Sequence, residues 1–263
     1  MRGIIDDAFF NVVCCILVYR IFHMSSAEFY DRFIAYQAES GINDRIHGLY
    51  RRLCQTGLTA DTSVLEVGCG IGMLTYLLLQ KIKTGRIEAT DISPLSIEFA
   101  KKHLVAPNLS LSAADILHFE PQSKQFDRVL LFDVLEHIPL EQHPQVFTRI
   151  SRWMNDESLL LINIPNPAYI LFDQQHHPGV LQETDQPVYI PALSASLASA
   201  SLDIVSLKTY HVWVKEDYQF IVARKRKDFK EQLLSNERNL LQKAVKWLGR
   251  KWRKLRFPYP PKH

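Results

Sequence analysis

Short apolar runs alternate with amphipathic segments over the middle of the chain. The apolar runs predict buried parallel strands, because both faces of such strands are covered; they lie at 63–67, 86–90, 109–113, 126–132 and 158–164. The segments between them carry apolar residues at helical spacing and predict helices at 73–83, 95–103 and 141–154. Regular alternation of strand and helix is typical of an α/β fold with a doubly wound, mostly parallel sheet.

Different patterns flank this alternating core. Residues 25–55 predict two amphipathic helices with a break at Gly41. Residues 163–191 are rich in proline and aromatic residues, and a loop of that length in a compact domain tends to be functional. The last part of the sheet is predicted as a helix of small residues at 192–201, followed by an antiparallel hairpin built from 202–211 and 218–223.

The net charge of +3 over 263 residues hides a strong asymmetry. From Arg224 to His263 there are 14 Lys and Arg against three acidic residues, a net charge of +11, so the rest of the chain carries −8. Residues 228–255 have apolar side chains at three- and four-residue steps and predict one basic amphipathic helix. The sequence leaves the binding partner of this helix open. The helix could dock on its own domain or on another protein, or 228–256 could contact an anionic membrane surface; nucleic acid is a less favoured partner.

The chain divides into four predicted segments: an apolar extension at 1–24, N-terminal helices at 25–56, the sheet domain at 57–226, and the basic tail at 227–263. The apolar run from Ala8 to Phe22 is shorter than the roughly 20 residues that a membrane span needs. Two interpretations stay open for it: a misassigned start with translation from Met24, or a packed or membrane-touching helix. Four cysteines without metal-ligand spacing indicate reduced thiols in a cytoplasmic protein and no metal site.

A glycine-rich turn follows the first predicted strand. Gly68, Gly70 and Gly72 permit a tight turn and close approach of a ligand to the backbone, at the start of a helix with unpaired N–H groups. The turn departs from the dinucleotide fingerprint G-x-G-x-x-G, because Met73 stands where that pattern needs its third glycine. The carboxylate of Glu66 would repel a pyrophosphate and would suit a ligand with a positive charge.

Two motifs carry a family resemblance. The pattern E-x-G-x-G-x-G at Glu66–Gly72 resembles the first motif of class I S-adenosylmethionine-dependent methyltransferases. The run Asp133-Val-Leu-Glu-His-Ile-Pro139 resembles the motif that follows the fourth strand in many small-molecule members. The resemblance covers residues 56–166 and implies a Rossmann-like sheet of seven strands in the order 3-2-1-4-5-7-6, with an antiparallel last-inserted strand and S-adenosylmethionine as the cofactor.

The resemblance also implies where the cofactor binds. Asp91, about twenty residues beyond the glycine turn, would accept both ribose hydroxyls, while Ser93 is the better candidate for the cap of the next helix. Asp115 would bind the adenine amino group, and Asp133 would lie near the amino-acid end of the cofactor. The implied cofactor-binding residues are Glu66, Gly68, Cys69, Gly70, Gly72, Asp91, Ile92, Asp115, Ile116 and Asp133.

His137 is the first candidate for a general base, because an unperturbed imidazole pKa of about 6.5 lies near operating pH. The alternative, that His137 only orients its loop, stays open. Candidate substrate contacts are Glu136, Tyr169, His176 and His177. The two adjacent histidines are not expected to chelate a metal together, since neighbouring residues rarely do so and a third ligand is not evident.

The sequence constrains the methyl acceptor less than the cofactor. The chain has no N-P-P-Y or D-P-P-Y tetrad after the fourth strand and no Pro-Cys pair, which disfavours methylation of DNA bases. We expect O-methylation of a small hydroxylated or glycan- or lipid-linked acceptor. Two alternatives stay open: an RNA methyltransferase that uses the basic tail, and a non-catalytic module that only binds the cofactor.

Overall fold

The computed structural model describes residues 34–177, 185–228 and 239–257. Contacts divide the chain into two compact units, residues 1–226 and 227–263. The apolar run Ala8–Phe22 and the alternative start at Met24 lie outside the described residues. No helix in the described part of the chain is both long enough and apolar enough to span a membrane.

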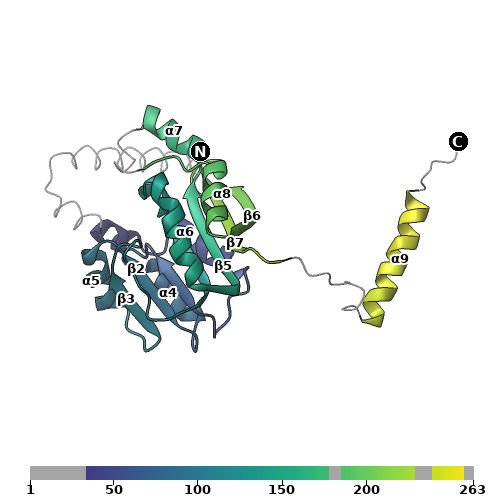
Figure 1. Cartoon of the computed structure of the whole chain (residues 1–263), viewed down its shortest axis with the longest axis horizontal. Coiled ribbons are helices and arrows are strands. Elements are labelled where there is room, and N and C mark those ends of the chain that lie inside the picture. Colours follow the sequence, from purple (N-terminus) through teal and green to yellow (C-terminus); the bar gives the residue numbers. More distant parts are fainter. Residues whose placement is uncertain (1–33, 178–184, 229–238, 258–263) are drawn as a thin grey trace, which may run out of the picture. The chain divides into compact units, whose positions relative to one another are not determined.

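The first unit contains a sheet of seven strands in the order β3-β2-β1-β4-β5-β7-β6 (Figure 1), so the predicted order is confirmed. The strands β1 to β5 run parallel, and β7 is antiparallel to both of its neighbours, β5 and β6. The bounds are β1 Val64–Val67, β2 Ile87–Asp91, β3 Leu109–Ala113, β4 Phe126–Phe132, β5 Met154–Pro165, β6 Leu202–Tyr210 and β7 Tyr218–Lys225.

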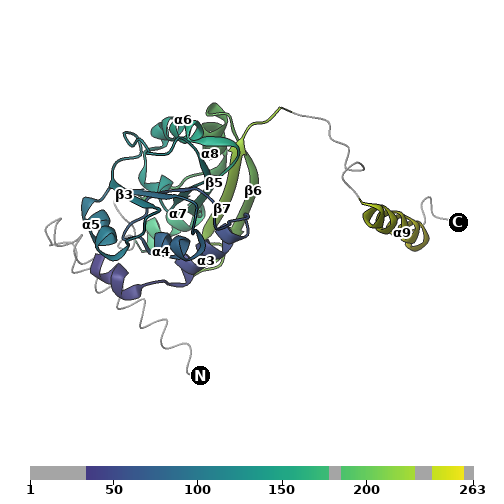
Figure 2. The ribbon, with the colours of Figure 1, turned by 90° about the horizontal axis from the view of Figure 1, so that it is seen from below.

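Helices cover both faces of the sheet (Figure 2). On one face α3 and α4 pack through Leu49 and Leu78, and on the other α6 and α8 pack through Phe147 and Leu193. All four of these side chains are fully buried, and apolar burial of this kind is the main favourable term in folding. The bounds are α3 Asp44–Cys54, α4 Met73–Lys81, α5 Pro94–His103, α6 His143–Arg152, α7 Pro167–His176 and α8 Ile190–Ser199.

Local signals explain where several helices begin. Asn43 caps α3 by accepting a hydrogen bond from the Ile46 amide, after the predicted break at Gly41, whose φ is +58°. Ser93 accepts a hydrogen bond from the Ser96 amide at the start of α5, so the predicted cap is confirmed. Because these caps are encoded by single polar residues, the sequence locates the helix starts closely.

Three predicted elements need correction. The segment 163–191 is not a continuous loop: β5 extends to Pro165, and α7 follows it, capped by Asn166, whose side chain accepts from the Ala168 amide. The helix predicted at 141–154 begins as a 3₁₀ turn at Leu140–Gln142 before α6. The tail helix α9 spans Leu240–Arg256 and does not begin at 228 as predicted, because the backbone of its N-cap residue Asn239 is extended.

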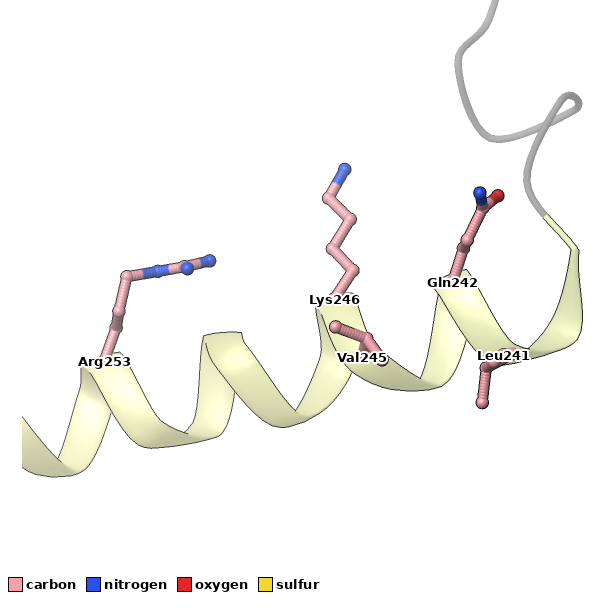
Figure 3. Close-up of a pocket in the computed structure, with 5 residues that line it drawn as sticks. All are labelled: Leu241, Gln242, Val245, Lys246 and Arg253. Carbon is pink, nitrogen blue, oxygen red and sulfur yellow. The ribbon is translucent and has the colours of Figure 1, made fainter.

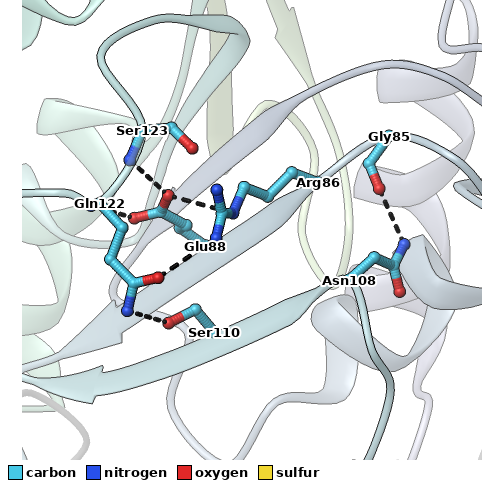
Figure 4. A network of polar contacts seen from close by, with 7 residues as sticks. All are labelled: Gly85, Arg86, Glu88, Asn108, Ser110, Gln122 and Ser123. Carbon is cyan, nitrogen blue, oxygen red and sulfur yellow. Dashed lines mark hydrogen bonds and ion pairs between the residues drawn. The ribbon is translucent and has the colours of Figure 1, made fainter.

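A buried carboxylate fixes the end of the sheet opposite the glycine turn (Figure 4). Glu88 of β2 is only 3% exposed, and its two oxygens accept hydrogen bonds of 2.8 Å from the backbone amides of Gln122 and Ser123. Arg86 lies 3.5 Å away from the same carboxylate, and the Gln122 side chain donates to Ser110 of β3. The Glu88 carboxylate thus has its hydrogen-bond partners within the fold and fixes the connection before β4. The candidate functional site lies at the other end of the strands, where the glycine turn is.

Candidate active site

The glycine turn after β1 has backbone geometry that requires glycine. Gly68, Gly70 and Gly72 have φ angles of +77°, +54° and +87°, in the left-handed region. A Cβ atom on Gly68 would collide with Val134, and one on Gly72 would collide with Leu104. A Cβ atom on Gly70 would meet nothing within 4 Å, so the turn is open above this residue.

Asp91, the last residue of β2, ties the glycine turn to the next strand. Its Oδ2 accepts a hydrogen bond of 2.7 Å from the Gly70 amide, and its Oδ1 accepts one of 2.8 Å from the Ser93 amide. Each carboxylate oxygen can accept a second hydrogen bond, so the pair retains acceptor capacity for two ligand hydroxyls. The neighbouring Ile92 is an apolar side chain that is 73% exposed.

Glu66 and Cys69 lie buried beside the turn. Glu66 Oε2 accepts a hydrogen bond of 2.6 Å from the Thr75 hydroxyl of α4, and burial raises the pKa of this carboxyl to about 7. Burial, together with the carboxylates of Glu66 and Asp91, raises the pKa of the Cys69 thiol well above its usual value. Cys69 packs against Ala89 and is therefore an unreactive small packing residue.

Asp115 and Ile116 follow β3 at the same sheet edge. Asp115 Oδ1 accepts a hydrogen bond of 2.8 Å from the Leu117 amide, and the side chain is 40% exposed. Ile116 is buried, and its carbonyl oxygen accepts a hydrogen bond of 3.1 Å from Arg149 Nε. The structure thus places predicted residues from four neighbouring strands, β3, β2, β1 and β4, at one edge.

Asp133 follows β4 with a φ of +57°, which is unusual for a residue other than glycine. Its Oδ1 accepts a hydrogen bond of 2.7 Å from Asn163 Nδ2, and its Oδ2 forms an ion pair with Arg45 of α3. Backbone strain of this kind concentrates at functional sites. Neither partner was predicted, since no sequence pattern links Arg45 or Asn163 to the end of β4.

A polar and aromatic surface continues from Asp133 across β5 and β6. Asn163 Oδ1 accepts a hydrogen bond of 2.8 Å from the Tyr210 hydroxyl, and the guanidinium of Arg52 lies 3.7 Å from the centre of the Tyr210 ring. Arg45 lies over the ring of Trp213 at 5.9 Å. We define these five residues, Arg45, Arg52, Asn163, Tyr210 and Trp213, as the acceptor-side cluster.

Buried Asp217 holds the loop that carries Trp213. Its carboxylate accepts hydrogen bonds of 2.9, 2.9 and 3.1 Å from the amides of Val212, Trp213 and Val214. An acid with three amide donors is a strong organiser of a turn. The sequence gives little sign of it, because Asp217 stands in an ordinary loop composition before β7.

Glu136 and His137 lie in the 3₁₀ turn Leu135–His137. Glu136 is 2% exposed, and its Oε2 has no hydrogen-bond partner among the described residues. Burial raises the pKa of this carboxyl to about 8; the negative charge of Asp185 acts in the same direction, and Arg45 partly opposes it. At neutral pH Glu136 is therefore mostly protonated and can donate a hydrogen bond.

His137 is paired with a carboxylate. Its Nδ1 lies 2.9 Å from Asp185 Oδ1, and the two side chains are 30% and 14% exposed. The Gln186 amide donates to the Glu136 carbonyl oxygen at 3.1 Å, which fixes the segment that carries Asp185 against the 3₁₀ turn. A carboxylate this close to Nδ1 favours a proton on that nitrogen, which would make Nε2 the nitrogen that accepts a proton.

The candidate substrate residues of α7 interact mainly within their own helix. His177 Nδ1 lies 3.0 Å from Asp173 Oδ1, and the His176 ring stacks on Phe172 at 4.2 Å. Burial, with the charge of Asp173, raises the pKa of Tyr169 to about 12. Within the described ranges there is no cluster of three metal-ligating side chains.

Comparison with known proteins explains this arrangement. Residues 64–157 match a family model described as a methyltransferase domain. Over this stretch the chain belongs to the methyltransferase-domain family. The same fold occurs in an S-adenosylmethionine-dependent methyltransferase from Clostridium acetobutylicum ATCC 824, with a TM-score of 0.58 and 14% identity over 75% of this chain and 99% of that one.

Curated relatives match over shorter stretches. Trans-aconitate 2-methyltransferase of Mycobacterium sp. (strain KMS) is 30% identical over 141 residues, which are 54% of this chain and 51% of the relative. (S)-Coclaurine N-methyltransferase of Thalictrum flavum subsp. glaucum is 34% identical over 104 residues, 38% of this chain and 28% of the relative. A third relative, malonyl-[acyl-carrier protein] O-methyltransferase of Priestia megaterium (strain DSM 319 / IMG 1521), is 34% identical over 84 residues, 32% of this chain and 30% of the relative. The chain thus matches about half of these relatives or less, and their names include both O- and N-methyltransferases.

Proposed function

We propose that the protein is an O-methyltransferase that moves the methyl group of S-adenosylmethionine to a hydroxyl of a small, glycan-type or lipid-linked acceptor. The pair formed by His137 and Asp185 carries the proposal, because methylation of a hydroxyl oxygen requires removal of its proton. His137 lies on the turn after β4, within the run that resembles a motif of small-molecule methyltransferases, and Asp185 lies on the segment before α8.

The described residues fit the cofactor at the glycine turn. The open space above Gly70 admits a ligand close to the backbone, and Asp91 has acceptor capacity for the two ribose hydroxyls. The exposed Ile92 would cover one face of the adenine, and Asp115 would accept from its amino group. Glu66, Cys69, Gly72 and Ile116, which are buried, would shape the site from below, and the exposed Gly68 would contact the cofactor through its backbone.

Asp133 would bind the amino-acid end of the cofactor. Its carboxylate is oriented by Asn163 and paired with Arg45, so it is held in place before a ligand arrives. A cofactor ammonium group would bind the carboxylate of Asp133, and a cofactor carboxylate would bind the guanidinium of Arg45. The arrangement therefore suits a zwitterionic amino-acid group.

His137 would perform the proton transfer. S-Adenosylmethionine supplies a methyl group on a sulfonium, which is already an activated leaving group. His137 Nε2 would take the hydroxyl proton of the acceptor while its Nδ1–H stays against Asp185, so the positive charge that develops on the ring is stabilised at 2.9 Å. Glu136, protonated at neutral pH, would donate a hydrogen bond toward the acceptor or the neighbouring carboxylates.

Three observations support a small acceptor. The acceptor-side cluster combines aromatic faces with a few polar groups, as is common in small-molecule sites. The names of the relatives refer to trans-aconitate, coclaurine and malonyl-[acyl-carrier protein], and the first two of these are small molecules. The sequence also lacks the N-P-P-Y or D-P-P-Y tetrad after the fourth strand, which disfavours a DNA base as the acceptor.

A radiolabelled methyl-transfer screen tests the proposal. Wild-type protein would be offered pools of sugars, lipid-linked sugars, phenols, amines and RNA, with cofactor binding measured separately by calorimetry. We expect transfer to a hydroxyl pool, and a loss of about 10²–10⁴-fold in turnover for His137→Gln at unchanged cofactor affinity. His103→Gln, at the exposed end of α5, serves as the matched control.

The other outcomes separate the alternatives. Transfer to amines alone would show an N-methyltransferase, and transfer to RNA alone would show that the basic tail serves nucleic acid. Cofactor binding without transfer to any pool would favour a non-catalytic module. Failure to bind S-adenosylmethionine at all would overturn the assignment of the cofactor site.

A further inference from the structure

The helix of the second unit, α9, has a well-defined start. Asn239 accepts a hydrogen bond of 2.9 Å from the Gln242 amide, and the Gln242 side chain accepts one from the Asn239 amide, which completes a capping box. None of the residues of α9 is buried. A helix with a capping box and an exposed apolar face is expected to bind a surface or molecule outside its own unit.

The two faces of α9 differ sharply in chemistry. One face is apolar, with side chains that are 54–85% exposed: Leu240, Leu241, Val245, Trp247, Leu248, Trp252 and Leu255. Seven Lys and Arg and no acidic residue occur between Leu240 and Arg256. In Figure 3, Gln242, Lys246 and Arg253 project from one side of the helix and Leu241 from the other. Within the described residues 239–257, α9 is therefore an amphipathic, basic helix whose apolar side chains are exposed.

We infer that α9 is a docking helix for an anionic lipid surface, on which it lies parallel to the membrane plane. Its apolar face would enter the boundary between headgroups and acyl chains, and its cations would contact lipid phosphates and carboxylates. Trp247 and Trp252 suit the headgroup level because an indole combines an apolar ring with an N–H donor. Lys251 already lies 4.1 Å from the centre of the Trp247 ring, so a cation accompanies the aromatic side chain there.

Other occupants satisfy only one of the two faces. RNA would neutralise the cations and leave the apolar side chains in water. A second copy of α9 would cover the apolar face but would bring seven positive charges against seven. The remainder of this chain, with its net charge of −8, offers charge complementarity to the basic face alone. An anionic membrane covers both faces at once.

Vesicle co-sedimentation of the full-length protein tests the inference, and it does not depend on methyl transfer. We expect pelleting with vesicles of phosphatidylcholine and phosphatidylserine, little pelleting with phosphatidylcholine alone, and weakening by salt. Lys246→Gln with Arg250→Gln should lower the partition coefficient about 25-fold, because each cation near an anionic surface contributes about fivefold. Lys101→Gln with Lys102→Gln, which changes the net charge equally on exposed α5, should leave it unchanged.

Insertion is measured separately with brominated lipids. Fluorescence of the wild-type protein should be quenched on binding, and the quenching should be lost in Trp247→Ala with Trp252→Ala, since the remaining tryptophans lie in the first unit. Equal pelleting of the α9 and α5 variants would overturn the inference. So would RNA binding that is lost in the α9 variants without any vesicle binding, or a dimer in light scattering that is lost in the Trp variant without any vesicle binding.

Discussion

His137 Nδ1 lies 2.9 Å from Asp185 Oδ1, in a pair that joins the turn after β4 to the segment that leads into α8. In a general base that is oriented by a carboxylate, the acid favours one tautomer of the imidazole and stabilises the imidazolium that forms; Asp185 would do the same for His137. Because the partner comes from a distant part of the chain, the fold and not the local motif positions His137 for its proposed role as a base.

The first prediction concerns this pair. Asp185→Asn should lower turnover with a hydroxyl acceptor, because the neutral amide cannot stabilise the positive charge that develops on the His137 ring. We expect the loss in Asp185→Asn to be smaller than in His137→Gln, and the double variant to be no slower than His137→Gln alone. Additive losses in a double-mutant cycle of turnover would show that the two residues act independently.

The second prediction concerns the ribose site. Asp91→Ala should weaken S-adenosylmethionine binding by about 1.5–3 kcal/mol for each hydrogen bond to the carboxylate that is lost. It should also loosen the glycine turn, because the Gly70 amide loses its acceptor at 2.7 Å. Calorimetry with S-adenosylmethionine and with NAD measures the effect. A wild-type protein that binds NAD and ignores S-adenosylmethionine would contradict the assignment.

The third prediction separates structural from ligand-binding glycines. Gly72→Ala should destabilise the folded protein by more than the roughly 1–2 kcal/mol of left-handed backbone strain, since its Cβ would also collide with Leu104. Gly70→Ala should suffer the strain alone, because its Cβ meets no protein atom within 4 Å, yet it should block the cofactor. Denaturant unfolding and cofactor calorimetry of both variants give the comparison. Normal cofactor affinity in Gly70→Ala would show that the open space is not the cofactor site.

The sequence predicts the central sheet well because its strands are strong local patterns. The apolar run 126–132 corresponds to β4 at both ends, and the glycine turn and the cap at Ser93 are encoded by a few adjacent residues. The helix α7 was missed because proline and aromatic content suggested a loop, although Asn166 followed by Pro167 is a clear helix start. The resemblance supplied the strand order, which periodicity alone cannot give.

The sequence predicts only those residues of the candidate site that lie next to a local motif. Asp91, Asp133 and His137 stand next to recognisable motifs, so they could be found from the sequence. Arg45, Asn163 and Asp185 complete the site through contacts between distant segments, which no local pattern records. The same reason explains Glu136: its motif was visible, but its burial and its proton depend on the surrounding packing.

The last prediction uses that buried carboxyl. The pKa of Glu136 in the folded protein is about 8, whereas an ordinary Glu has a pKa near 4.3 in the unfolded chain. The folded state therefore holds a proton that the unfolded state releases. The contribution of Glu136 to stability is fully present below about pH 4 and is lost as pH rises through 8.

In Glu136→Gln this loss is absent, because the side chain is neutral at every pH. One pKa unit corresponds to about 1.4 kcal/mol, so the variant should be more stable than the wild type by a few kcal/mol near pH 8 and by only about 1 kcal/mol near pH 5. Urea unfolding at the two pH values without cofactor measures the difference, and Glu66, whose pKa is also raised, is present in both proteins and cancels. An equal stability difference at pH 5 and pH 8 would show that Glu136 does not carry the proton.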